Sequence, residues 1–323
     1  MKVANPIYDT VFKYLMEDME IARRFLSEII GEEIVKIAIR PQEHTHKTAK
    51  HGITILRFDF TATIKLKEKK YLAEANKKNW QAQYKTVLIE LQKAKKQKDI
   101  ERFRRYLAEN YQKKYMIPDK NGQMIAANLP IVTIYILGFP MPPIETSILK
   151  INRVYTDLNT NKALKVQTEF IEKLTHDCYA ILIRKLPKKS RSELERVLQI
   201  FNQTYILDAD NKFLDIKENM VKENKLLELM SNRLRNAAMD KEILEGILIE
   251  QEVDEMIDQH IRDKEELVET IKEREETIKE NNKKMKEKDE ALEEKDKKMQ
   301  EKDAVLEEQK KLIEELKKKL KQK

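Results

Sequence analysis

The C-terminal part of the sequence constrains the fold most strongly, because it is too highly charged to enter a globular core. Residues 261–323 carry 20 basic and 20 acidic side chains, and one apolar residue recurs at every seventh position. Such a spacing is typical of the seam of a coiled coil. The recurring residues are Ile271, Ile278, Met285, Leu292, Met299, Leu306, Ile313 and Leu320. We therefore predict a charged heptad-repeat helix (coiled coil) over residues 261–323.

The second seam position of this repeat is polar, which leaves two interpretations of the helix open. The residues three positions after successive anchors are Arg274, Asn281, Lys288, Lys295 and Lys302, and an apolar residue returns only at Leu316. Charged residues at a seam weaken a two-stranded coil. Residues 261–323 are therefore either a loose parallel coil that joins chains into a homo-oligomer, or a single helix held by Glu–Lys pairs four residues apart.

The preceding residues show the pattern of an α/β domain. Of the 323 residues, 41% are hydrophobic, which is enough for a core in part of the chain. Helical apolar spacing predicts one helix after Asn5-Pro6, a second over Met19–Ile30 that stops at Gly31, and a third over Asp99–Tyr115. We predict a globular domain over residues 1–210 and a helical connector over 211–260.

Strand patterns alternate with these helices. The predicted strands are "EEIVKIAIRP" (32–41), "ITILRFDFTATIKL" (53–66), "KTVLIELQ" (85–92), "LPIVTIYILGFP" (129–140) and "CYAILIRKL" (178–186). The fourth is apolar on both faces and is predicted to be central. A polar loop is expected at "EHTHKTAKHG" (43–52), a polar insertion at 67–84, and an amphipathic helix near "RSELERVLQIF" (191–201). Together they predict a mixed central sheet flanked by helices.

Composition indicates a soluble, cytoplasmic protein with no membrane contact. The N-terminus "MKVANPIYDTVFKYL" has a proline and an aspartate where a signal peptide needs an apolar segment. The longest strongly apolar run, Ile131–Phe139, is far shorter than the roughly 20 residues of a membrane-spanning helix. The single cysteine, Cys178, cannot form an intramolecular disulfide, and no thiol-enzyme motif accompanies it. We interpret it as a structural thiol.

Positive charge is concentrated in one region of the chain. The net charge is +7, yet residues 65–114 alone contain 16 Lys or Arg against 6 Asp or Glu. Aromatic residues such as Trp80, Tyr84 and Phe103 are interspersed among these cations. A basic segment with interleaved aromatics suits a polyanion such as a nucleic acid. The alternative is a solvated, lysine-rich loop and helix.

Two of the predicted strands hold an acid within an apolar run, Asp59 in "RFDF" and Glu90 in "VLIELQ". Burying an ionised carboxylate is costly unless a positive group lies against it. Glu90 and Gln92 are two residues apart, so their side chains leave the same face of the strand. If the two strands pair, the carboxylates of Asp59 and Glu90 converge, and a divalent cation such as Mg²⁺ removes their repulsion. The alternative is a set of structural ion pairs with Arg57, Lys85 or Lys93.

This arrangement of an acid on one strand and Glu-x-Gln on the next resembles the PD-(D/E)XK nuclease superfamily, in the branch of recombination-promoting (Rpn-like) nucleases and PD-(D/E)XK nuclease family transposases. The similar segments are "NPIYDTVFKYL", "RFDF", "VLIELQKAK", "RFRRYLAENY", "IVTIYILGF" and "LTHDCYAILIRKLP". They span about residues 5–205. The resemblance implies a restriction-endonuclease-like fold, followed here by the long helical tail.

The resemblance also implies roles for individual residues. Asp59 and Glu90 would bind Mg²⁺ or Mn²⁺ with the carbonyl of Leu91, and Asp9 would add a carboxylate from the opening helix. Gln92 would stand where most members have a catalytic lysine, completing a catalytic set of Asp59, Glu90 and Gln92. Because glutamine is uncharged, the metal must then supply more of the transition-state stabilisation.

Residues in the basic region are the predicted nucleic-acid contacts. By the resemblance, Arg102, Arg105 and Tyr106 would face the substrate phosphates, a task suited to the planar guanidinium group. Lys93 and Lys95 lie in the same basic region and complete the predicted contacts. The sequence departs from the family at Phe58, where a proline usually precedes the first acid, and in the insertion over 67–84.

The function predicted from these features is that of an Mg²⁺-dependent DNA endonuclease associated with transposition or recombination, which hydrolyses phosphodiester bonds. The alternative is a catalytically inactive nucleic-acid-binding or scaffold protein that assembles through its coiled-coil tail.

Overall fold

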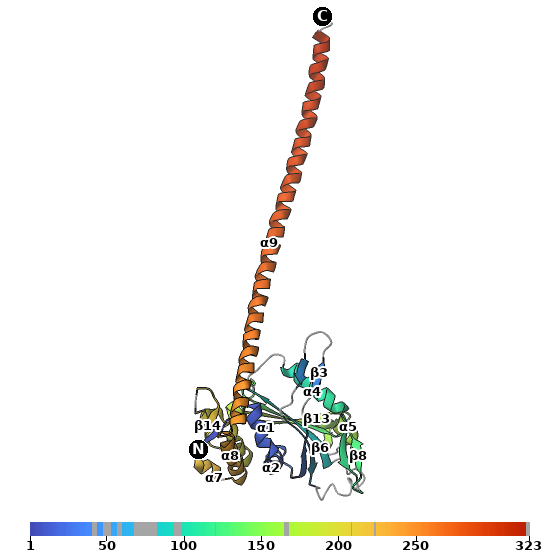
Figure 1. The fold of residues 1–323 in the computed structure, drawn as a ribbon. Coiled ribbons are helices and arrows are strands. Elements are labelled where there is room, and N and C mark those ends of the chain that lie inside the picture. The colour runs from blue at the N-terminus through green and yellow to red at the C-terminus, as the bar shows by residue number, and fades with distance from the viewer. Residues whose placement is uncertain are drawn as a thin grey trace. The chain divides into compact units, whose positions relative to one another are not determined.

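The structure is a computed structural model that describes residues 1–40, 44–47, 53–56, 60–67, 83–93, 99–119, 121–164, 168–207, 209–222 and 224–320 (Figure 1). It consists of two units, Met1–Gln251 and Glu252–Lys323. The first unit extends past the predicted domain end at residue 210, because residues 211–251 pack with it and do not form a separate connector.

Two helices follow the first short strand, β1 (Lys2–Ala4), as the apolar spacing predicted. They are α1 (Asp9–Glu17) and α2 (Met19–Ile30). The Asp18 carboxylate accepts hydrogen bonds from two main-chain N–H groups in the first turn of α2. Gly31 ends α2 in the left-handed region, with φ of 72°, where glycine is favoured because it lacks a Cβ.

The centre of the first unit is a six-stranded mixed sheet with the order β10-β13-β9-β6-β5-β2. Its strands are β2 (Ile34–Ile39), β5 (Phe60–Leu66), β6 (Tyr84–Gln92), β9 (Ile131–Leu137), β10 (Ile148–Ile151) and β13 (His176–Leu182). β9 is parallel to both of its neighbours, β6 and β13, and the other pairs are antiparallel. The mixed sheet and the central position of its most apolar strand are confirmed.

Different helices cover the two faces of this sheet (Figure 1). Val87, Ile89 and Leu91 of β6 belong to the large core cluster that includes apolar residues of α1, α2 and α8 (Lys225–Ala237). The alternate residue Leu88 packs instead with Phe103 of α4 (Asp99–Gln112). The period-two alternation of a strand thus separates an α1 face from an α4 face.

The remaining strands form four small two-stranded sheets. They are β1 with β14 (Phe213–Asp215), β3 (His44–Lys47) with β4 (Ile53–Leu56), β7 (Tyr115–Pro118) with β8 (Met124–Ala127), and β11 (Tyr155–Asp157) with β12 (Lys162–Leu164). The other helices are α5 (Glu169–Leu174), α6 (Glu193–Leu198), α7 (Glu218–Lys222) and α9 (Lys241–Leu320), with short 3₁₀ turns at Ile183–Lys185, Gln199–Phe201 and Gln203–Tyr205.

The strand predicted over 53–66 is two strands in the structure. β4 pairs with β3, which occupies part of the predicted polar loop, and β5 pairs with β2 and β6. The β-branched residues Ile53, Thr54 and Ile55 of β4 suit a strand, since such side chains favour strands. Residues 57–59 lie outside the described residues, as do residues 68–82 of the predicted insertion.

The C-terminal helix α9 confirms the helical part of the tail prediction and is compatible with a coiled coil. Two Glu–Lys pairs four residues apart stabilise it, Glu280–Lys284 at 2.7 Å and Glu294–Lys298 at 2.6 Å. Among the helices that the structure describes, none has the length and apolar character needed to cross a membrane.

Low pH should lower the free energy of unfolding through protonation of Glu195. Its buried carboxylate accepts hydrogen bonds from Ser147 Oγ at 2.9 Å and from Arg191 Nη2 at 2.6 Å. The Arg191 side chain is the main cause that lowers the pKa of Glu195 from 4.5 to about 2. The unfolded chain, with the higher pKa, binds the proton more tightly, so this stabilisation is complete above about pH 4.5 and is lost as the pH falls towards 2.

Because Arg191 is exposed to screening solvent, we expect this contribution to be on the order of 2 kcal/mol at neutral pH. Urea unfolding between pH 6 and pH 2.5 should show Glu195→Gln destabilised at pH 6, with most of this difference gone at pH 2.5. A difference that stays constant with pH would contradict this assignment.

Candidate functional site

The pairing of β5 with β6 brings the two acid-bearing segments of the sequence together. The strands are antiparallel, and at one end of their register Phe60 lies opposite Ile89. Both residues are buried in the large core cluster on the α1 face. Glu90 follows Ile89 in β6, whereas Asp59, which precedes Phe60 in the sequence, lies outside the described residues. The pairing on which the convergence of the two acids depends is therefore present in the structure for β5 as far as Phe60.

Glu90 is completely buried, with 0% of its surface exposed. By the alternation of β6, its side chain shares the α4 face with Leu88, which packs against Phe103 and Tyr106. The residue opposite Glu90 in β9 is Tyr135, whose ring centroid lies 4.4 Å from that of Phe103. Glu90 thus lies in a mostly apolar layer beneath α4, where a carboxylate requires compensation by a cation or by hydrogen bonds.

Two further ionisable groups face the same layer. Burial is the main cause that raises the pKa of Tyr135, and the neighbouring Cys178 and Glu90 raise it further. Burial likewise raises the pKa of the Cys178 thiol. Both groups are therefore protonated at neutral pH. The protonated thiol agrees with the structural role predicted for Cys178, since the thiolate is the nucleophilic form.

Gln92 and Leu91 occupy the C-terminal end of β6. Gln92 is half-buried, and its main-chain carbonyl accepts a hydrogen bond from the Gly138 N–H at 2.7 Å. The side chain of Leu91 is buried in the core on the α1 face. Glu90 and Gln92 therefore share one face at the end of the strand, as their spacing predicted.

Gly138 permits the close approach of β9 to the end of β6. A Cβ at this position would lie 2.5 Å from the main-chain oxygen of Lys93 and 3.1 Å from that of Gln92. Because these atoms are backbone, Gly138→Ala must move the end of β6. We expect a loss of about 1–3 kcal/mol in the free energy of unfolding. If Gln92 belongs to an active site, activity should also fall by about 10–100-fold.

Gly122→Ala is the matched control for this prediction. An added Cβ there meets no atom within 4 Å, but φ is +83°, so the substitution should cost only about 1–2 kcal/mol of backbone strain. Urea unfolding and cleavage assays on both variants separate the two effects. Equal activity of the two variants would contradict a role for the end of β6.

The start of α1 and the end of β6 are joined by Glu250 from α9. Its carboxylate accepts hydrogen bonds from the main-chain N–H groups of Asp9 at 2.9 Å and Thr10 at 2.6 Å, which are unsatisfied donors at a helix N-terminus. Lys93 Nζ lies 3.1 Å from the same carboxylate and 4.2 Å from the centroid of the Tyr8 ring. Lys93, a predicted nucleic-acid contact, thus forms an intramolecular ion pair in this structure.

The predicted nucleic-acid residues of α4 lie in different surroundings. Arg105 is exposed, and so is its neighbour Arg104, which the resemblance did not select. Tyr106 is only 1% exposed and packs in the core beneath α4, so the prediction that it faces the substrate is wrong for this structure. The Arg102 side chain and the whole of Lys95 lie outside the described residues.

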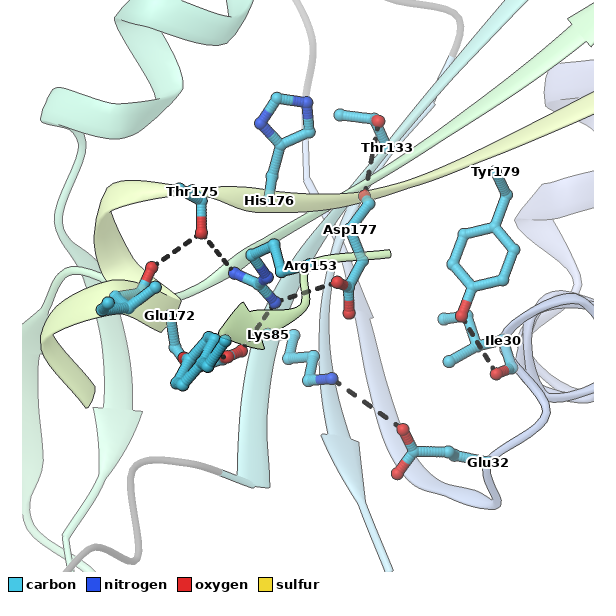
Figure 2. A network of polar contacts seen from close by, with 12 residues as sticks. Ile30, Glu32, Lys85, Thr133, Arg153, Glu172, Thr175, His176, Asp177 and Tyr179 are labelled. Atoms are coloured by element: carbon cyan, nitrogen blue, oxygen red, sulfur yellow. Dashed lines mark hydrogen bonds and ion pairs between the residues drawn. The ribbon is translucent and has the colours of Figure 1, made fainter. Parts of the chain in front are cut away.

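A network of polar contacts centred on Arg153 lies at the N-terminal end of β13 (Figure 2). The Arg153 guanidinium donates to Glu172 at 2.8 Å, Asp177 at 2.9 Å and Thr175 at 2.7 Å. The register of the parallel strands places this end of β13 away from the ends of β6 and β9 that carry Gln92 and Gly138. The network therefore lies at the opposite end of the strands.

Two of the cations considered as ion-pair partners for the strand acids form other ion pairs. Lys85 Nζ lies 3.9 Å from a carboxylate oxygen of Glu32, and Lys93 contacts Glu250. Figure 2 marks the Lys85–Glu32 ion pair. The third, Arg57, lies outside the described residues. Both of these ion pairs are formed with acids outside β5 and β6.

Sequence patterns gave no indication of the roles of Glu250 and Gly138. Glu250 is 157 residues from Lys93 along the chain, and nothing in its helical sequence distinguishes it from the other glutamates of α9. A glycine directly after a buried strand is the weak signal that could have indicated Gly138, because close approach of another strand excludes a side chain.

The described residues include no group of three or more His, Cys, Asp or Glu side chains that could hold a metal ion, and the predicted ligand Asp59 is not among these residues. At the candidate site, the described residues provide three oxygen donors: the carboxylate of Glu90, the main-chain carbonyl of Leu91 and the side-chain amide oxygen of Gln92. No protein-family model, curated protein or solved structure matches this chain.

Proposed function

We propose that this chain is a divalent-metal-dependent endonuclease in which Asp59 and Glu90 hold the ion. The observation that carries the proposal is the antiparallel register of β5 and β6, which ends with the pair Phe60–Ile89. The next residues in the sequence beyond this pair are Asp59, before Phe60, and Glu90, after Ile89. Continuation of the pairing by one residue is part of the proposal. It would place the two Cβ atoms about 4.5–5.5 Å apart on the α4 face.

The order of elements also supports a restriction-endonuclease-like fold. Five segments of the resemblance correspond to α1, β6, α4, β9 and β13, and α6 follows the last of them. The last residue of the sixth segment, "RFDF" (57–60), is Phe60, the first residue of β5. The central sheet is mixed and has helices on both faces. Each part of the proposed site therefore lies on a regular element or next to one.

The donors at the proposed site suit a hard cation. Carboxylate and amide or carbonyl oxygens are the protein ligands that Mg²⁺ takes beside a phosphate substrate. Such an ion, when bound, would polarise the phosphodiester and lower the pKa of a bound water. Glu90 would supply a buried negative charge for it. Gln92 would orient water through its amide, which cannot deliver a proton as a charged acid does.

A nucleic-acid substrate is supported by the charge around this site. The segment 65–114 contains β6 and α4 and carries ten more basic than acidic residues, 16 against 6. Arg104 and Arg105 are exposed on α4, on the same side of the sheet as Glu90. Guanidinium groups bind phosphates through two parallel hydrogen bonds, so this helix is the proposed DNA contact.

The test is nicking of supercoiled plasmid by the purified full chain with Mg²⁺ or Mn²⁺. We expect conversion to the open circular form, and chelation of the metal should stop it. Salt-sensitive DNA binding with no cleavage under either ion would contradict the proposal and favour a binding or scaffold protein.

A further inference from the structure

The Glu252–Lys323 unit carries a stripe of regularly spaced apolar residues that nothing in the unit covers, as far as its described residues show. The stripe consists of one residue per heptad, each 48–63% exposed: Ile271, Ile278, Met285, Leu292, Met299, Leu306 and Ile313. The positions between them are mostly charged, with isolated exposed apolar residues such as Val305. Apolar side chains aligned on a solvated helix are favourable to bury against another surface.

The polar seam position that weakens a coiled coil has a charge pattern of its own. With each stripe residue taken as heptad position a, position d holds Arg274, Lys288, Lys295 and Lys302, and position e, the next residue, holds Glu275, Asp289, Asp296 and Asp303. A basic d residue is thus followed by an acidic e residue in four heptads. In a parallel in-register pair, a d side chain enters a hole whose walls include the e residue of the other helix. Each cation would therefore lie beside an acid of the second helix.

The g positions add to this complementarity. Lys284 and Lys298 occupy position g, and the e residues five positions later are Asp289 and Asp303. Contacts between g of one helix and the following e of the other set the orientation of parallel coils. In an antiparallel pair the e residues of the two helices would face one another, bringing acidic rows together. The charges therefore favour the parallel arrangement.

We propose that two copies of this chain pair through residues 271–313 of α9 as a parallel, in-register coiled coil. The occupant of the apolar stripe is the same stripe of the second copy, and the d cations are neutralised by the e acids of the partner. This inference does not depend on the proposed nuclease activity, because it concerns only the Glu252–Lys323 unit.

Disulfide trapping tests the orientation in the full chain. With Cys178 replaced by serine, Met285→Cys and Met299→Cys are prepared as separate proteins and oxidised. A parallel in-register pair places each a residue against its own copy, so each protein alone should form covalent dimers. Gln300→Cys, at the outward position after Met299, is the control that should not. Covalent dimers only after mixing the two proteins would show an antiparallel pair and overturn the proposal.

Sedimentation equilibrium tests the pairing itself. We expect a dimer mass for the full chain, and Ile278→Lys with Leu292→Lys should weaken dimerisation at least roughly 100-fold, because two apolar contacts per helix are lost. Gln300→Lys adds the same charge at an outward position and should leave the dimer intact. A monomer mass for the unaltered chain would overturn the proposal and leave a single helix held by Glu–Lys pairs. Dimers that persist in the double variant would also overturn it.

Discussion

Glu90→Gln should lower Mg²⁺-dependent plasmid nicking about 1000-fold, the factor expected when several kcal/mol of metal-based transition-state stabilisation are lost. The substitution keeps the size and shape of the side chain but removes the negative charge that the ion would need. Asp59→Asn should have an effect of similar size if the two residues bind one ion. Initial nicking rates at saturating Mg²⁺ give both values.

Since Glu90 is fully buried, loss of activity must be separated from loss of folding. Circular dichroism and thermal melting of Glu90→Gln should be close to those of the unaltered chain, because the amide is nearly isosteric with the carboxylate. Glu28→Gln, on the exposed side of α2, removes the same charge elsewhere and should leave nicking unchanged. Retention of full activity in a folded Glu90→Gln protein would refute the proposed site.

Arg153→Met should lower the free energy of unfolding by about 2–3 kcal/mol, because it breaks a largely buried charge cluster from one side and such clusters are costly to leave uncompensated. The Arg153, Glu172 and Asp177 side chains are each only 18% exposed. Removal of the guanidinium leaves two carboxylates without their shared cation. Figure 2 shows that the same guanidinium also connects to Thr175, at the end of α5. Urea unfolding at neutral pH measures the loss.

The matched control is Arg196→Met. Arg196 pairs with Glu193 across one helical turn at 2.7 Å, and these side chains are 32% and 56% exposed. Exposed pairs of this kind contribute about 0–1 kcal/mol. If the two variants lose the same stability, the network around Arg153 does not stabilise this end of the sheet as its contacts indicate.

Local rules predicted the elements whose causes are local. The apolar spacing of α1 and α2, the glycine stop at Gly31 and the alternation in β6 act within a few residues, and the structure follows them. The division of 53–66 into β4 and β5 was missed because both halves have the same strand pattern. Only the choice of partner, β3 or β6, distinguishes them, and partner choice is a tertiary effect.

The domain end at 210 was misplaced for the same reason. Residues 211–251 look like a polar, helical connector, yet Leu226, Leu227, Met230 and Leu234 of α8 are buried in the main core. β14 pairs with β1 across more than two hundred residues, with Leu214 opposite Val3. Such long-range pairing has no local signature in the sequence.

At the candidate site, the common face of Glu90 and Gln92 followed from the two-residue period of a strand. The pairing of β5 with β6 was only a condition at the level of the sequence, and the structure supplies it. The burial of Tyr106 was not predicted. An Arg-Arg-Tyr segment in a basic helix suits a phosphate-binding surface equally well, but the helical period turns Phe103 and Tyr106 inwards together and leaves Arg104 and Arg105 outside.

The central claim is that Asp59 and Glu90 share one divalent ion. Crystals of the protein grown with Mn²⁺ would test it directly, because the anomalous signal of manganese locates the ion independently of the protein atoms. We predict one peak within roughly 2–2.5 Å of a carboxylate oxygen from each of the two residues. A peak elsewhere, or carboxylates of Asp59 and Glu90 on opposite faces of the sheet, would contradict the account.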